Sequence, residues 1–155
     1  MQNLLNIPGL QVFERGWLSA NNILLTDAFS STLIDSGYVT HQDQTLLLLK
    51  SALGSRPLDQ LVNTHLHSDH CGGNAALAEA FHCEVYIPAA EEAAVKNWDS
   101  ALLSYDNLGQ ECPQFSHHHV LVPGEEIVLG RYLWKVLAAP GHDPHSIMLY
   151  QADHR

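Results

Sequence analysis

Short apolar runs, rich in β-branched residues and separated by polar turns, occupy the first third and the last quarter of the chain. Runs of this kind, bounded by Gly, Pro, Asn or Ser, are typical of β-strands. The pattern predicts strands at Leu10–Phe13, Trp17–Leu25, Ser31–Asp35, Leu61–Val62, Cys83–Ile87, Glu126–Leu129, Arg131–Ala138 and Ser146–Tyr150. The second of these contains a mostly polar stretch, Ser19–Asn22.

Helical spacing marks the middle of the chain, where Leu46, Leu49 and Leu53 fall on one helix face. The segments predicted to be helical are Gln42–Leu53, capped by Thr40 and ended by Gly54; Asn74–Phe81, with Asn74 as its N-cap; and a segment from Pro88 to about Trp98. Residues 101–119 show no clear pattern. Strands, then βα units, then strands again predict one α/β domain over residues 1–155, with helices covering a mixed sheet.

Composition and charge exclude some classes of binding partner. Seventeen acidic against seven basic residues leave a net charge of -10, which repels phosphate backbones, so we expect no nucleic-acid partner. No apolar run is long enough to cross a bilayer, and the N-terminus lacks the pattern of a signal peptide, so we expect no membrane partner. Three cysteines at unrelated spacings argue against a disulfide framework and favour a cytoplasmic location.

Histidine is unusually frequent, with eleven in 155 residues, and four potential metal ligands cluster in residues 63–74. In an extended segment alternate residues point the same way, so His65 and His67 project together. Asp69 follows at the next even position, where a turn can bring its carboxylate inward. His70 is displaced to the other side and can serve a second metal. Imidazole and carboxylate ligands suit zinc, iron or manganese.

A catalytic zinc needs three protein ligands and an open position for water. His142, in a turn between two predicted strands, is the candidate for the missing ligand. His145 is interpreted as a solvated side chain or a neighbour of the ligands, and Cys71 as a packing residue. Gly72 and Gly73 are interpreted as letting the backbone turn from strand to helix without crowding the metal.

The segment Thr64-His65-Leu66-His67-Ser68-Asp69-His70-Cys71-Gly72-Gly73-Asn74 resembles the signature of the metallo-β-lactamase superfamily, whose fold the glyoxalase II thioesterases share. Two further segments resemble neighbouring motifs of that family: Leu33-Ile34-Asp35-Ser36-Gly37 and Ala139-Pro140-Gly141-His142-Asp143-Pro144-His145-Ser146. The resemblance implies an αββα sandwich with metals at the lip between two sheets. It also implies that His65, His67 and His142 bind the first metal, and that Asp69 and His70 contribute to the second.

The chain departs from the family pattern at its end. Family members continue with a strand ending in a second-site aspartate and later supply a further histidine, and Asp153 comes too early for that role. The chain is therefore interpreted as truncated before the C-terminal half of the sandwich. One sheet face is then expected to be uncovered and hydrophobic, unless a homo-oligomer or a missing C-terminal segment covers it.

The function predicted on these grounds is zinc-dependent hydrolysis of a small-molecule ester, thioester or amide-like substrate, with one or two zinc ions. Zinc on three neutral imidazoles activates a bound water, and Asp69 orients or deprotonates it. Two alternatives stay open. One is a non-haem iron oxidoreductase, because the chain also resembles persulfide dioxygenases and flavodiiron proteins at this motif. The other is a catalytically inactive metal-binding fragment.

Overall fold

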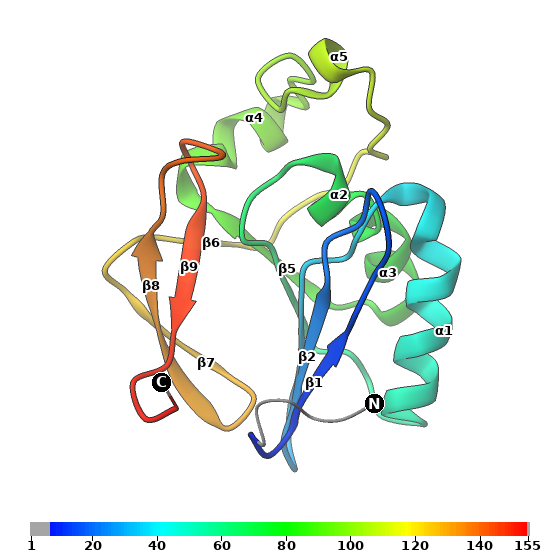
Figure 1. The fold of residues 1–155 in the computed structure, drawn as a ribbon, viewed down its shortest axis with the longest axis vertical. Helices are drawn as coiled ribbons and strands as arrows, with labels where there is room; N and C mark the ends of the chain where they lie inside the picture. The colour runs from blue at the N-terminus through cyan, green and yellow to red at the C-terminus, as the bar shows by residue number, and fades with distance from the viewer. Residues whose placement is uncertain (1–6, 155) are drawn as a thin grey trace.

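Two β-sheets form the framework of the protein in the computed structural model, which describes residues 7–154, and the smaller sheet lies at one side (Figure 1). The larger sheet has the strand order β1-β2-β3-β4-β5-β6. Its strands are β1 (Leu10–Phe13), β2 (Asn22–Thr26), β3 (Ser31–Ile34), β4 (Gln60–Val62), β5 (Glu84–Pro88) and β6 (His119–Leu121). The pairs β1–β2 and β2–β3 are antiparallel, whereas β3 to β6 run parallel, so the sheet is mixed as expected.

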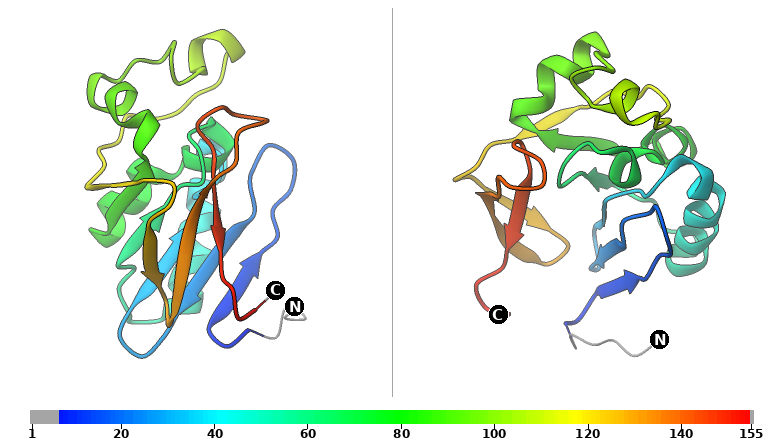
Figure 2. Two further views of the ribbon diagram at one scale, coloured as in Figure 1. Left: turned by 90° about the vertical axis from the view of Figure 1, so that its left-hand side faces the viewer. Right: turned by 45° about the horizontal axis from the view of Figure 1, so that its top comes forward.

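The smaller sheet is an antiparallel meander of β7 (Glu126–Leu129), β8 (Tyr132–Ala138) and β9 (Ile147–Tyr150). Alternation along each strand separates an inner from an outer face. Leu129, Val136 and Ile147 are buried, and they join Leu25 and Val62 of the larger sheet in one apolar cluster. The two sheets therefore pack face to face (Figure 2).

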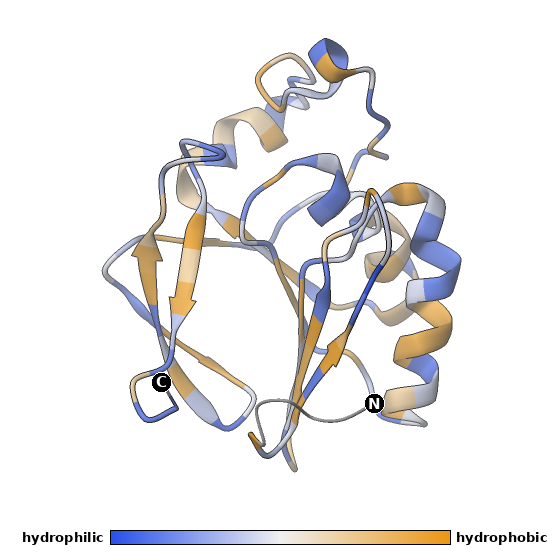
Figure 3. Cartoon of the chain, viewed as in Figure 1, coloured by the Kyte–Doolittle hydropathy of each residue, from blue (hydrophilic) through white to orange (hydrophobic). Residues whose placement is uncertain are grey.

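Helices pack on the other face of the larger sheet and beyond the carboxyl ends of its strands (Figure 1). They are α1 (Gln42–Leu53), α2 (Ser68–Cys71), α3 (Asn74–Phe81), α4 (Glu92–Asn97) and α5 (Tyr105–Leu108), with 3-10 turns at Val39–His41 and Ala89–Glu91. Leu49, Leu77 and Val95 from these helices pack against Leu33 and Leu61 of the sheet in a second core cluster. The layers are thus helix, sheet and sheet, and hydrophobic residues colour much of the strands (Figure 3).

The outer face of the smaller sheet carries apolar side chains in contact with solvent. Val128, Leu133 and Met148 are 59%, 52% and 49% exposed. Among residues 7–154 no helix lies over this face, so the described part of the chain shows three of the four expected layers. The uncovered apolar face agrees with the sequence prediction. None of the described helices is long and apolar enough to cross a membrane.

The predicted strand over Trp17–Leu25 is wrong in its first half, because the strand begins at Asn22. Leu18 has a positive φ of 59° and Trp17 is 87% exposed, so this part of the chain is a turn. The residues between Leu18 and β2 make their hydrogen bonds outside the sheet: Asn21 accepts one from the Arg15 backbone N–H at 2.8 Å, and the Ala20 backbone N–H donates to the Asp69 carbonyl oxygen at 2.9 Å.

Both predicted helix caps are also corrected. Thr40 lies inside the 3-10 turn, and the N-cap of α1 is His41, which makes no side-chain capping bond. The N-cap of α3 is Gly73, because the Asn74 side chain is wholly buried and bonded elsewhere. Gly54 does end α1, with a positive φ of 62°. The hydrogen bonds that replace Asn74's predicted capping bond are part of the site described next.

Candidate metal centre

The predicted ligands meet where the parallel strands end at their carboxyl edge. Asp35 follows β3, the histidine segment follows β4, and Glu91 follows β5. The loop between β8 and β9 brings His142 to the same edge, and the Ile147 backbone N–H donates to the Thr64 carbonyl oxygen at 2.9 Å. Loops at the carboxyl ends of strands form the usual site in open α/β sheets.

Three histidines converge there, as the sequence predicts. The ligand nitrogens of His65, His67 and His142 all lie within 4.8 Å of one another. His67 Nδ1 and His142 Nε2 are 2.9 Å apart, and the rings of His65 and His67 are edge to face at 4.8 Å between centroids. Two nitrogens on one tetrahedral zinc, each bound at about 2.0–2.1 Å, lie about 3.3 Å apart. The separations therefore suit a single ion.

The environment of His65 fits a metal ligand. The residue is 6% exposed, and its Nε2 is buried without a hydrogen-bond partner among the described residues. Burial, and next the charge of His70, lower the pKa of His65 to about 4. A buried imidazole nitrogen without a hydrogen-bond partner lowers the stability of the folded protein unless a ligand binds that nitrogen. A cation among the three nitrogens would remove that cost, so the residues present fit zinc.

His70 is held by Asp35, a residue to which the sequence analysis gave no role. Asp35 Oδ2 lies 2.8 Å from His70 Nδ1, and the same carboxylate accepts from the Thr64 backbone N–H at 2.9 Å and the Thr64 hydroxyl at 2.8 Å. Burial alone lowers the pKa of His70, but the hydrogen bond and charge of Asp35 hold it above its usual value. Since a carboxylate only accepts, Nδ1 carries the proton, and Nε2 of the neutral ring is left with a lone pair.

Asp69 lies beside that free nitrogen. Its Oδ2 is 3.5 Å from His70 Nε2, and its side chain is 36% exposed. Neither Asp69 nor His70 belongs to the three-histidine group, and among the described residues no third histidine, cysteine or acid completes a set with the two of them. The pair is therefore separate from the first group, and its binding of a second ion stays a prediction.

Close packing of the backbone, and not space for a metal, explains why residues 72 and 73 are glycines. A Cβ on Gly72 would lie 2.6 Å from the Val39 nitrogen, and one on Gly73 would lie 2.8 Å from the Ser36 carbonyl oxygen. Neither glycine has a positive φ. Their role is thus to let the loop after β3 approach α2, which corrects the prediction that they keep side chains away from the metal.

Buried polar side chains fasten the same loops. Asn74 Oδ1 accepts from the Ser36 hydroxyl at 2.7 Å, and Asn74 Nδ2 donates to Asn63 Oδ1 at 2.7 Å. The Ser36 backbone N–H donates to the His70 carbonyl oxygen at 2.7 Å. The loop after β3, the end of β4 and the start of α3 are therefore joined behind the histidines, which fixes the site on rigid elements.

A second group of ionisable side chains lies beside the three histidines. The ligand atoms of Glu91, Asp143 and His145 lie within 4.8 Å of one another. Glu91 is 5% exposed and contacts His145 Nδ1 at 2.9 Å, while Asp143 accepts from the His145 backbone N–H at 2.7 Å. The other oxygen of Asp143 lies 3.5 Å from His67 Nε2. A carboxylate at that nitrogen favours the tautomer that leaves Nδ1 free.

Sequence reasoning assigned no role to Asp35, Glu91 or Asp143. Asp35 and Asp143 sit inside the motifs that frame the histidines, and for Asp35 the available signal was an acid at the end of a predicted apolar strand. Nothing in the sequence places Glu91 near His145. Tyr105 is 4% exposed and contacts Cys71, so it lies in the core.

Comparison with known proteins identifies the family. The chain belongs to the metallo-beta-lactamase superfamily, whose family profile matches residues 15–155. Over 96 residues it is 29% identical to proteins called hydroxyacylglutathione hydrolase from Brucella ovis and Brucella melitensis. The match covers 62% of this chain and 30% of each relative.

Solved structures show the same fold. The chain superposes on the BLEG-1 B3 metallo-beta-lactamase with a TM-score of 0.75 at 23% identity, covering 92% of this chain and 66% of that one. For the FEZ-1 metallo-beta-lactamase from Legionella gormanii the TM-score is 0.72 at 18% identity, covering 84% and 51%. The MIM-1 enzyme from Novosphingobium pentaromativorans gives 0.68 at 26%, covering 84% and 49%. The chain thus spans about half to two thirds of the length of these relatives.

Proposed function

We propose that the protein is a zinc-dependent hydrolase that uses a metal-activated water on a small-molecule ester, thioester or amide-like substrate. The observation that carries the proposal is the convergence of three imidazole nitrogens within 4.8 Å, one of which is buried without a partner. His65 through Nε2, His67 through Nδ1 and His142 through Nε2 would hold the ion. Bound zinc supplies a water of near-neutral pKa and polarises a substrate carbonyl.

The chain's own residues set up the proton transfer. Asp69 is partly exposed at the edge of the site, so its carboxylate can accept a proton from the attacking water and orient it. Asp35 keeps the His70 ring turned with Nε2 toward Asp69. Asp69 and His70 would also contribute to a second ion, although among the described residues no further histidine, cysteine or acid completes a set with the two of them.

The substrate class rests on the family and on the chemistry of the site. Relatives are named for hydrolysis of hydroxyacylglutathione, and structural neighbours for hydrolysis of β-lactams. Both names imply attack on an acyl group, for which water activated at a metal needs no serine or cysteine nucleophile. The net charge of -10 makes nucleic-acid substrates the least suitable.

Metal content tests the proposal. Protein purified without a histidine tag and without added metal is expected to contain zinc by elemental mass spectrometry, and to hydrolyse at least one member of a panel of thioesters, esters, lactones and β-lactams. The His67→Ala variant should lose both the zinc and the activity. His119→Ala is the matched control, because His119 is a half-exposed histidine that contacts Glu84 on the surface.

Three results would contradict the proposal. If the His67→Ala variant kept its zinc and its turnover, His67 would not be a zinc ligand. Firmly bound iron with oxygen consumption would move the protein to the oxidoreductase class. Tight zinc binding by the folded chain without turnover on any acyl substrate would leave a metal-binding domain without this chemistry.

A further inference from the structure

Two of the three cysteines meet behind the metal centre, on elements far apart in sequence. Cys71 ends α2, directly after His70, and Cys112 lies 41 residues later in the segment between α5 and β6. Their sulfur atoms are 3.8 Å apart, which is van der Waals contact. The Tyr105 hydroxyl lies 3.1 Å from the Cys71 sulfur and donates to the Leu66 carbonyl oxygen at 2.9 Å. The sulfurs are therefore held together by the fold.

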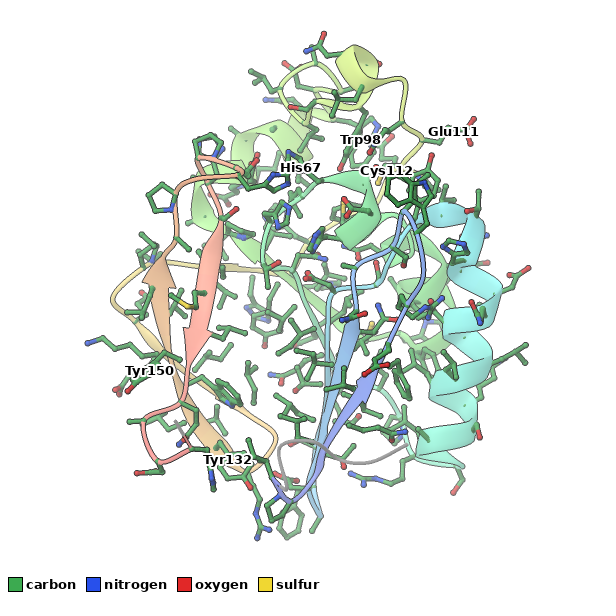
Figure 4. All side chains as sticks on the ribbon, viewed as in Figure 1. His67, Trp98, Glu111, Cys112, Tyr132 and Tyr150 are labelled. Carbon is green, nitrogen blue, oxygen red and sulfur yellow. The ribbon has the colours of Figure 1, made fainter. Side chains whose placement is uncertain are left out.

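The two thiols differ in their access to solvent. Cys71 is completely buried, whereas Cys112 is partly exposed. Cys112 also lines a cavity of about 310 Å³ together with Trp98, Tyr105 and Gln110. Figure 4 shows Cys112 next to α2 on the side of Trp98 and Glu111. A small oxidant can therefore reach Cys112 and not Cys71. The hydrogen bond with Cys71 lowers the pKa of the Cys112 thiol, which favours the reactive thiolate there.

We propose that Cys71 and Cys112 form a reversible disulfide when the protein meets a peroxide. The Cys112 thiolate attacks one peroxide oxygen, the O–O bond breaks, and Cys112 becomes a sulfenic acid as hydroxide leaves and takes up a proton. The Cys71 sulfur then attacks the Cys112 sulfur, and the sulfenic hydroxyl departs with the Cys71 thiol proton as water. Two thiols are oxidised to one disulfide, and one peroxide is reduced to two waters.

The cross-link would act next to the proposed metal centre. The Cys71 carbonyl oxygen already accepts from Cys112, and the Ser68 hydroxyl contacts the Gln110 side chain, so residues 110–112 lie along α2. The same helix carries Asp69 and His70. A disulfide would fix the segment after α5 onto this helix, and reduction would release it. The proposal does not depend on which metal or substrate the protein uses.

Peroxide oxidation of the purified, fully reduced protein tests the pair. We expect the chain to lose the mass of two hydrogens at a rate independent of protein concentration. Peptide mapping without reductant should then show Cys71 joined to Cys112 with Cys83 free. Cys83 is the internal control, because burial raises its pKa to about 11 and it is 3% exposed. The Cys83→Ser variant should form the same link, and a reductant should restore both thiols.

A denatured sample shows whether the fold selects the pair. In denaturant the three cysteines should give mixed pairings, whereas the folded chain should give one. Cys112 oxidised to sulfinic acid while Cys71 stays a thiol would overturn the proposal, as would disulfide-linked dimers through Cys112 or the absence of any reaction. In Cys112→Ser the two remaining thiols should not join, and a Cys71–Cys83 disulfide in that variant would show that the observed proximity does not decide the pairing.

Discussion

Replacing Asp35 by asparagine should test the hydrogen-bonding role inferred for this carboxylate. The side chain is 6% exposed and accepts three hydrogen bonds, one from His70 Nδ1 and two from Thr64. In the variant, one oxygen becomes an amino group of the same size. If the amide oxygen continues to accept from the Thr64 backbone, the amino group faces the His70 N–H. Two donors then oppose each other in a buried position.

The expected cost follows from these contacts. A hydrogen bond to a charged group contributes about 1.5–3 kcal/mol, and an unsatisfied buried donor costs about 1–3 kcal/mol. Asp35→Asn should therefore lower the free energy of unfolding of the metal-free protein by about 2–4 kcal/mol, which corresponds to roughly 5–15 °C in Tm for a chain of this size. The ring can relieve part of the conflict by moving its proton from Nδ1 to Nε2, which removes the lone pair that faces Asp69.

Denaturant unfolding of chelator-treated protein measures the loss, and nitrogen NMR at alkaline pH reports the tautomer of the neutral His70 ring. Asp59→Asn is the matched control, since Asp59 accepts from the Ser31 backbone N–H and hydroxyl at the far end of β3 and contacts no histidine in the structure. We expect the control to keep the His70 tautomer unchanged. Equal unfolding midpoints for Asp35→Asn and the unsubstituted chain, with the same tautomer in both, would refute the role of Asp35.

Three further predictions concern the same site. The pKa of His65 is lowered from 6.5 to about 4 in the folded protein, so unfolding takes up a proton between about pH 6.5 and pH 4. As the pH falls through that window, the stability of the metal-free protein should decline more steeply in the unsubstituted chain than in His65→Gln. Parallel pH profiles of the two proteins would exclude His65 as the cause. A Cβ on Gly73 would lie 2.8 Å from a backbone oxygen, whereas a Cβ on Gly16 would meet nothing within 4 Å. Gly73→Ala should therefore lower the unfolding midpoint in denaturant by far more than Gly16→Ala. Asp143→Asn should weaken zinc binding about 10-fold in chelator competition, because the carboxylate beside His67 Nε2 is lost; unchanged affinity would contradict the inference.

Local patterns in the sequence were sufficient for much of the secondary structure and for singling out His65 and His67 as candidate ligands. The boundaries of α1, α3 and β7 agree with the prediction to the residue. These segments have strong periodicity and clear ends, so local propensity and tertiary packing favour the same structure. The histidine cluster was visible because its members are neighbours in the chain, and alternation along an extended segment places His65 and His67 together without knowledge of the fold.

Other features depended on segments that are remote in sequence. Trp17 and Leu18 are apolar, which suggested a strand, but the turn before β2 leaves Trp17 exposed. Asn74 had the composition of a helix cap, but the wholly buried contact with Ser36 satisfied its side chain instead. At Asn74 the local preference was overruled by where the loop after β3 lies, and a single sequence does not contain that information.

The sequence by itself determined the α/β class, the first three-histidine group and the expectation of an uncovered apolar sheet face. Only the tertiary structure decided which side chains that are remote in sequence meet at the candidate site and behind it. Asp35 reaches His70 across 35 positions of sequence, Glu91 reaches His145 across 54, and Cys71 reaches Cys112 across 41. The physical reason is that ligand identity follows from residue chemistry and local spacing, whereas hydrogen-bonded support depends on which strand ends and loops the sheet order brings to one edge.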